Sequence, residues 1–281
     1  RIGLHDLFVQ IGLLYQVLHF DFKPGKKLAI EIPSLTEQKK ITDTLSNLDA
    51  TIALHQRKHD LLLKLKKGYL QKLFPQNGDA EPELRFSGFT DAWEKRQLGE
   101  IAKRVTRKNT SLESTLPLTI SAQDGLVDQN DYFKKQVASK DVSGYYLVKI
   151  GEFAYNKSYS KDYPLGAIKR LDKYDKGVLS TLYIVFEPKN VNTNFLATYF
   201  DSTCWYEQVG IRAAEGARNH GLLNIAPKDF FEIKLQIPHN EKEQVQVAAF
   251  FQSLDETIAL HQRKLGELKE LKKAYLQKMF V

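Results

Sequence analysis

The 281-residue chain has only one cysteine, Cys204, and this scarcity excludes two kinds of site. One thiol cannot close an internal disulfide, and it cannot build a zinc site on cysteines. We expect Cys204 to be a buried structural thiol and, with no export signal, the chain to be cytoplasmic. Long apolar runs are also lacking. The stretch that most resembles a targeting segment, residues 1–20, is interrupted by Asp6, Gln10, Gln16 and His19, so no membrane contact is expected.

Motifs of two enzyme classes are absent as well. No Gly-Lys-Ser or Gly-Lys-Thr phosphate loop occurs, so ATP should not bind, and no Asn/Asp-Pro-Pro-aromatic methyltransferase motif occurs. Glu232 and Lys234, with Asp229 upstream, have the Glu-x-Lys form of a nuclease site. The two carboxylates are too close in sequence for the usual placement on separate strands, so we interpret this segment as an ordinary alternating strand. A stand-alone nuclease remains the least favoured alternative.

The charge balance is basic. Lysine and arginine exceed aspartate and glutamate, which gives a net charge of +7 and a pI near 9.1. An excess of this size favours a polyanionic partner such as nucleic acid, although an ordinary solvated surface would also account for it. Hydrophobic residues make up 42% of the chain and aromatics 11%, which is ample for a packed core.

One sequence element occurs twice, 206 positions apart. Residues 48–58 read LDATIALHQRK and residues 254–264 read LDETIALHQRK, and 19 of 30 positions are identical between 45–74 and 251–280. The form Ser34-Leu35-Thr36-Glu37 is a capping box, which predicts that a helix begins there. That helix meets no glycine or proline before Gly68.

Candidate seam positions, most of them apolar and including His59, Lys66 and Lys272, alternate at steps of four and three in both copies, the spacing typical of a coiled coil. The long middle segment allows the two copies to pair antiparallel, and a single amphipathic helix packed on the globular domain is the alternative. The seam positions expected in the first copy are Leu48, Ile52, His55, Leu62 and Tyr69. Those expected in the second copy are Leu254, Ile258, His261, Leu265, Leu268, Tyr275 and Met279.

Histidines share one seam position in the two copies, His55 and His261. A metal site would need another ligand three or four residues away, which the second copy lacks. We interpret the two histidines as polar residues that set the register, and we expect no metal.

The middle of the chain has no long helical period. Short β-rich runs predict strands at 116–120, 145–150, 152–155, 166–170, 177–186 and 231–237, and short helices are expected at 93–105 and 193–207. A further strand is expected at 28–33. The fold class is therefore α+β, with a globular domain between two long helices. We divide the chain into an N-terminal segment (1–33, a packed helix or the remnant of a lost domain), first helix (34–74), linker (75–83), globular domain (84–238) and second helix (239–281).

Two phrases bracket the globular domain. The first, LRFSGFTDAWE at 84–94, leads to QLGEIA at 97–102. The second, GLLNIAPKDFF at 221–231, leads to Ile237-Pro238 and a helix start at Glu243-Gln244. Together with the repeated helix, these phrases resemble the specificity (S) subunit of type I restriction-modification systems. The resemblance covers roughly residues 28–281.

That resemblance implies a non-catalytic subunit whose target-recognition domain reads one half of a bipartite site in double-stranded DNA. It implies that the coiled coil holds two such domains apart and docks methyltransferase (M) subunits, which carry S-adenosylmethionine. A motor-nuclease (R) subunit that uses ATP and magnesium joins them. These cofactors are expected on the partners and none on this chain. A coiled-coil scaffold that does not read DNA is the main alternative.

The chain departs from the family in having one recognition domain with both helices. It looks like the second half of an S subunit plus the preceding helix. Either it is truncated, or it forms a homodimer or pairs with a second specificity chain. A homodimer would imply a palindromic target, because half-sites mirror the protein two-fold.

Polar, cationic and aromatic side chains suited to DNA gather in three segments. Arginine and asparagine can recognise guanine and adenine edges, and lysines and hydroxyls can hold phosphates. Ordinary solvated loops are the alternative for each segment. The candidate contacts are Lys103, Arg104, Arg107, Lys108, Asn156, Lys157, Ser158, Tyr159, Lys161, Arg212, Arg218, Asn219 and His220.

Overall fold

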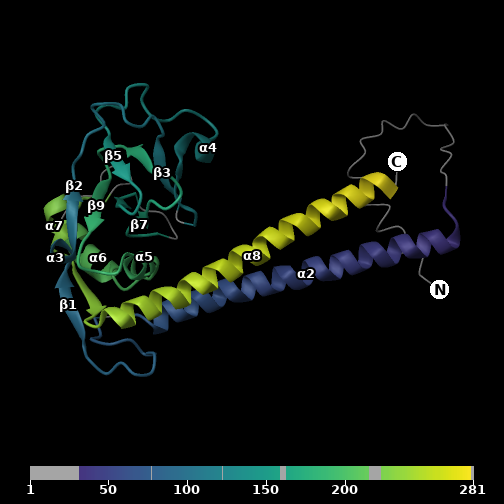
Figure 1. Ribbon diagram of the computed structural model, residues 1–281, viewed down its shortest axis with the longest axis horizontal. Helices are drawn as coiled ribbons and strands as arrows, with labels where there is room; N and C mark the ends of the chain where they lie inside the picture. Colours follow the sequence, from purple (N-terminus) through teal and green to yellow (C-terminus); the bar gives the residue numbers. More distant parts are fainter. Residues whose placement is uncertain (1–31, 77, 122, 159–162, 215–222, 280–281) are drawn as a thin grey trace.

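A computed structural model describes residues 32–76, 78–121, 123–158, 163–214 and 223–279. Two long helices lie side by side and carry a globular domain at one end of the pair (Figure 1). Helix α2 spans Leu35–Lys72 and helix α8 spans Glu241–Met279. The side-chain oxygen of Ser34 accepts a hydrogen bond from the Glu37 amide, 3.3 Å away, so the predicted cap begins α2.

Helices α2 and α8 run antiparallel, with the end of α2 beside the start of α8 (Figure 1). All twelve predicted seam side chains are buried or half-buried. The prediction of a coiled coil is therefore confirmed, and the single amphipathic helix is excluded. The seam side chains of each helix, which one helix could not bury alone, are covered by the seam of the other copy.

Reciprocal ion pairs relate the two helices by a local two-fold axis. Lys66 lies 2.7 Å from Asp255, and Lys272 lies 2.5 Å from Asp49. Adding 206 to the residue numbers of Lys66 and Asp49 gives Lys272 and Asp255. The two ion pairs therefore join the same two repeat positions, with the helices exchanged. Contacts exchanged in this way define an isologous interface. We call this axis the local two-fold.

The globular domain is built from antiparallel strands. A four-stranded sheet has the order β2 (Ala102–Val105), β9 (Ile184–Pro188), β6 (Phe153–Asn156), β7 (Ala167–Arg170). Three further pairs are β1 (Trp93–Gln97) with β10 (Lys234–Pro238), β3 (Leu118–Ser121) with β4 (Gly125–Asp128), and β5 (Tyr146–Lys149) with β8 (Lys176–Leu179). The helices are α3 (Leu98–Ile101), α4 (Gln129–Phe133), α5 (Thr193–Asp201), α6 (Tyr206–Ala214) and α7 (Pro227–Phe231). The predicted α+β class is confirmed.

Four predicted elements differ from the structure. The helix expected at 93–105 is wrong: β1, the single turn α3 and β2 occupy it, because β1 pairs along its whole length with β10. The strand expected at 177–186 is two strands, β8 and β9, with a turn closed by the Tyr183 amide and Ser180 carbonyl. The helix expected at 193–207 breaks at Ser202, whose hydroxyl donates to the Tyr199 carbonyl.

The strand expected at 231–237 begins only at Lys234, because Pro227 starts the short helix α7. Proline fits the first helical position since its fixed φ suits a helix and its missing N–H is not needed there. The strand expected at 28–33 lies almost entirely outside the described residues, and Ile32 and Pro33 are in no regular element.

The core of the globular domain continues into the ends of both long helices. Phe74, at the end of α2, is fully buried, and its ring lies 5.6 Å from that of Tyr199 and 6.0 Å from that of Phe251. Trp93 and Phe195 complete this aromatic cluster. Burying a large apolar side chain stabilises a fold by about 1.5–3 kcal/mol, so the cluster attaches the domain firmly to the coil.

The two phrases that bracket the domain meet at one buried carboxylate. Glu243 in α8 is 1% exposed and accepts hydrogen bonds from Arg85 at 2.7 and 2.8 Å and from the Trp93 indole at 3.1 Å. The next residue, Gln244, accepts from the Asn192 amide and donates to the Pro238 carbonyl. The entry phrase and the helix start that follows the exit phrase therefore form a single joint, which we call the Glu243 joint.

Within the described ranges, no helix combines the length and the apolar character needed to span a membrane.

Candidate nucleic-acid interface

The first candidate segment lies on an edge strand. Lys103 and Arg104 are exposed on β2, which hydrogen-bonds only to β9 in its sheet. Exposed cations on an edge strand oppose unwanted strand addition and are also free to contact phosphates. Lys103 and Arg104 therefore stay predictions as DNA contacts, with geometry that permits the role.

The next two cations have partners inside the domain. Arg107 donates to both carboxylate oxygens of buried Glu152, at 2.8 and 2.9 Å. Lys108 donates to the Gly144 carbonyl, and its ammonium lies 4.4 Å from the centre of the Tyr146 ring. The Arg107 pair neutralises a buried charge, which is a structural task. Any DNA contact by either residue would compete with these bonds.

The structure places Lys157, in the second candidate segment, beside Leu223. The Lys157 carbonyl accepts a hydrogen bond from the Leu223 amide, 3.0 Å away, so the loop after β6 adjoins the end of the loop after α6. Asn156 turns its side-chain oxygen onto the Ser158 amide at 3.0 Å, while Ser158 itself is exposed. Burial lowers the pKa of Lys157. Five candidates lie outside the described residues: Tyr159, Lys161, Arg218, Asn219 and His220.

A glycine fixes how the β6–β7 connection closes. Gly166 has φ +78°, and a Cβ built there would lie 2.2 Å from the Asn156 carbonyl oxygen and 2.9 Å from the Tyr155 ring. Only glycine accepts both the left-handed backbone and this close approach without strain. Asn156, at the start of the connection, is therefore positioned by a backbone packed directly on Gly166.

Arg212 on α6 also has internal partners. Its guanidinium donates to the Glu232 carbonyl at 2.8 Å and to the Gln208 carbonyl at 3.2 Å. The first bond ties α6 to the end of α7. Arg212 thus has a structural role that its prediction as a DNA contact did not foresee.

The residues of the nuclease alternative are spread over different elements. Asp229 lies within α7, Glu232 follows its last turn, and Lys234 begins β10. Glu232 and Lys234 are exposed, and Ile233 between them is fully buried. Among the described residues no group of three or more histidine, cysteine or acidic side chains is placed to hold a metal ion. The geometry gives this alternative no support.

One exposed aromatic pair was missed by the sequence analysis. Tyr132 and Phe133 end α4, are 51% and 44% exposed, and their rings make an edge contact at 4.9 Å. Lys134 and Lys135 follow and are also exposed. Aromatic rings beside cations suit stacking on bases and contact with phosphates. The run Tyr-Phe-Lys-Lys was the signal available in the sequence.

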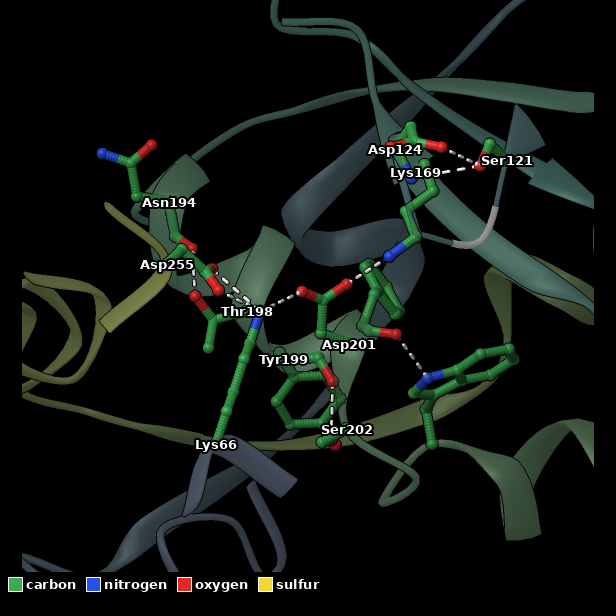
Figure 2. Close-up of polar contacts among 12 residues, drawn as sticks. Lys66, Ser121, Asp124, Lys169, Asn194, Thr198, Tyr199, Asp201, Ser202 and Asp255 are labelled. Carbon is green, nitrogen blue, oxygen red and sulfur yellow. Dashed lines mark hydrogen bonds and ion pairs between the residues drawn. The ribbon is translucent and has the colours of Figure 1, made fainter. Parts of the chain in front are cut away.

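The contact between domain and coil contains a charged network (Figure 2). Asp201, the last residue of α5, lies 2.5 Å from Lys169 of β7 and 3.4 Å from Lys66 of α2. Lys66 also reaches Asp255 of α8. Burial alone would lower the pKa of Lys66, but Asp201 and Asp255 outweigh burial and raise it. The ammonium is therefore held charged at the junction.

Two adjoining cavities, of about 560 and 460 Å³, flank this network, and we call them the junction groove. Lys169, Asp201 and Asp255 line both, and they are the residues drawn at the centre of Figure 2 with Lys66. The groove is lined by both charged and apolar side chains from the coil and the domain, with Leu63, Leu70 and Phe200 among the apolar ones. It marks where the two are not in close contact.

Exposed leucines follow the outer surface of the coil. Leu54, Leu61 and Leu65 are spaced seven and four apart, which places them on one face of α2, and each is about half exposed. We call them the leucine stripe. Leu260 and Leu271 repeat Leu54 and Leu65 under the local two-fold and are exposed to a similar degree.

A family model of the type I restriction modification DNA specificity domain matches residues 19–64 and 90–270. Comparison with curated proteins finds no match. The matched residues include most of α2, all of the strands and most of α8.

Solved structures share the fold. An HsdS subunit from Thermoanaerobacter tengcongensis is 15% identical, with TM-score 0.51 over 97% of this chain. A type I restriction-modification S subunit from M. genitalium is 18% identical, with TM-score 0.54 over 88%. A structure of the type I R-M system, concerned with complex assembly and conformational transition, is 15% identical, with TM-score 0.51 over 96%. The chain spans 67%, 62% and 67% of these proteins.

Proposed function

The chain belongs to the type I restriction modification DNA specificity family, and from this premise we propose that it reads one half of a bipartite site and docks methyltransferase subunits through its coiled coil. Recognition of DNA sequence, without catalysis, is the role of this family's specificity subunits. The observation that carries the docking proposal is the leucine stripe with its repeat under the local two-fold.

Exposed apolar side chains in a row are costly to leave in water and mark contact surfaces. The stripe lies outside the seam, so pairing of α2 with α8 leaves it uncovered. A partner helix can bury such a row as it would a coiled-coil seam. Leu260 and Leu271 repeat Leu54 and Leu65, although Glu267 stands in the place of Leu61. The coil therefore offers two related surfaces, which suits two M subunits.

Support for the DNA contact comes from the recognition domain. Lys103, Arg104 and Ser158 are exposed, and the loops at 157 and 223 adjoin. Tyr132 and Phe133 add stacking surfaces on another part of the domain. The net charge of +7 favours the same partner.

A bipartite site needs a second recognition domain, and the local two-fold offers a place for it. Tyr69 and Leu70 pack against the domain core, and their equivalents Tyr275 and Leu276 lie half-buried at the far end of the coil. We propose that a second copy of the chain or a second specificity chain supplies this domain. The M subunits would bring S-adenosylmethionine, and the R subunit would bring ATP and magnesium chemistry.

The test is co-purification with the methyltransferase subunits, followed by sequencing of methylated adenines in cells that carry both. We expect a two-part methylated motif. Leu54→Glu combined with Leu260→Glu should abolish co-purification, because the two substitutions place a charge in each of the two contact surfaces. Ala53→Glu combined with Ala259→Glu, on neighbouring exposed positions outside the stripe, is the matched control. A random methylation pattern would favour the scaffold alternative.

A further inference from the structure

The recognition domain touches the coil at two separate levels. The first, at the end of the coil, is the aromatic cluster around Phe74 and Phe251 together with the Glu243 joint, to which Trp93 of the cluster donates a hydrogen bond. The second is the network of Lys66, Asp201 and Asp255, eight residues earlier along α2. Helix α2 ends at Lys72, so Lys66 lies six helical residues, or about 9 Å, from the end of the helix that carries the first level. A contact at the end of the coil alone would let the recognition domain tilt about that end. A second contact farther along the coil fixes the angle between the domain and the coil.

At the second level, the junction groove separates much of the domain surface from the coil. Asp201 lines both of its cavities, which have volumes of about 560 and 460 Å³. Among the described residues, the ion pair of Asp201 with Lys66 joins the domain to the coil here, and the pair of Asp201 with Lys169 holds the carboxylate within the domain. Both lysine side chains are less than a fifth exposed, so these pairs are screened less than surface pairs.

The sequence repeat distinguishes ion pairs that are part of the coiled coil from ion pairs that attach the globular domain. Lys66–Asp255 has a counterpart, Lys272–Asp49, at the other end of the coil. The pairing of these lysines with aspartates across the helices is therefore part of the coil itself. The contact of Lys66 with Asp201 is added only where the domain sits.

We propose that Asp201 is a positioning residue that fixes the angle of the recognition domain on the coil. It thereby makes the protein selective for the length of the spacer, the stretch of DNA between the two halves of its bipartite site. This inference rests on the proposed function, since a spacer exists only in a bipartite site. Asp201 takes no part in base recognition; it acts through Lys66 and Lys169.

A small tilt of the recognition domain is enough to change the spacer length that the protein accepts. Successive base pairs are about 3.4 Å apart along the helix axis. A domain of this size has a radius of gyration of about 15 Å, so a tilt of about 13° about the aromatic cluster moves its surface by one base pair. Loss of one attachment allows such a tilt, and sites with spacers one pair too long or too short then become acceptable.

The angle can be measured on the chain itself. Spin labels on Thr181→Cys in the β8–β9 turn and Gly266→Cys on α8 report the domain–coil distance; both positions are exposed. We expect Asp201→Asn and Lys66→Met to broaden the distance distribution about twofold. Lys272→Met is the matched control, because it breaks only the equivalent coil pair, and it should leave the width unchanged. An unchanged width in Asp201→Asn would overturn the proposal.

The effect on DNA is measured with the methyltransferase complex and a set of sites whose spacers differ by one base pair. We expect Asp201→Asn to reduce the preference for the best spacer by about fivefold, with the half-site sequence unaltered. Equal preferences in the variant and the native protein would overturn the spacer role. If the native complex methylates no site specifically, the proposed function fails, and the label distances still decide whether Asp201 fixes the angle.

Discussion

The Nδ1 atoms of His55 and His261 lie 2.9 Å apart across the coiled coil, and their rings are tilted by 49°. The two residues are related by the repeat of 206, so they face each other on the local two-fold. Two such nitrogens can share a hydrogen bond only if one is protonated and the other is not. The centre of the coil is therefore a polar contact that requires at least one neutral ring.

We predict that acid destabilises the coil through this pair. Burial, followed by the charges of His55, Lys58 and His59, lowers the pKa of His261 below 6.5. A group whose pKa is lower in the folded state binds more protons when unfolded. Stability should thus be greatest above pH 6.5 and fall as the pH drops through 6.5 towards the folded pKa. Melting followed by circular dichroism from pH 7.5 to 5.5 measures this.

The control for the histidine prediction is the double variant His55→Asn, His261→Asn. Asparagine keeps a polar pair in the seam and does not titrate in this range. We expect the pH dependence of melting to flatten in this variant. A slope equal to that of the native protein would assign the effect to other groups.

Removing Arg85 should cost much more stability than removing another paired arginine. Arg85→Ala leaves the 1% exposed Glu243 carboxylate without its cation, which typically costs about 3–5 kcal/mol. Arg96→Ala breaks pairs with exposed Glu100 and half-exposed Glu94 and should cost about 0–1 kcal/mol. Urea unfolding monitored by tryptophan fluorescence compares the two. Similar losses would contradict the assignment of Glu243 as the joint of the two phrases.

Gly166→Ala should destabilise the recognition domain. The left-handed backbone alone costs an alanine about 1–2 kcal/mol, and the new Cβ would meet the Asn156 carbonyl oxygen. We expect a total loss above about 2 kcal/mol, together with weaker sequence-specific DNA binding. Gly144→Ala, where a Cβ meets no atom within 4 Å, should change stability by less than about 1 kcal/mol. Equal effects would show that the close approach at Gly166 is unimportant.

Cys204 should react slowly with thiol reagents in the folded protein. Burial raises the pKa of its thiol to about 11, against 9.0 in the unfolded chain. Two pKa units mean about a hundredfold less thiolate at pH 8, and the thiolate is the reactive form. Colour release from a disulfide reagent, compared in native buffer and in urea, measures the ratio. A native rate near the unfolded one would contradict the structural role of this thiol.

The candidate DNA contacts illustrate why residue type identifies a site only in part. Arg107, Lys108 and Arg212 carry the right charge, yet their partners are Glu152, Gly144 and Glu232. None of these partners is within ten residues in sequence, so no local pattern could reveal that the cations were occupied. The local sequence also could not predict that Lys103 and Arg104 are exposed on an edge strand, because strand order is set by tertiary packing.

Sequence alone determined the coil, because a seam repeated every 3.5 residues can be buried in few ways and its second copy was the available partner. It also determined the N-cap of α2 at Ser34, since this cap depends on residues only three apart. Tertiary structure alone decided that 93–97 is a strand, because its partner β10 is about 140 residues away. It likewise decided that Asp201 meets Lys66, a contact between elements that only packing brings together.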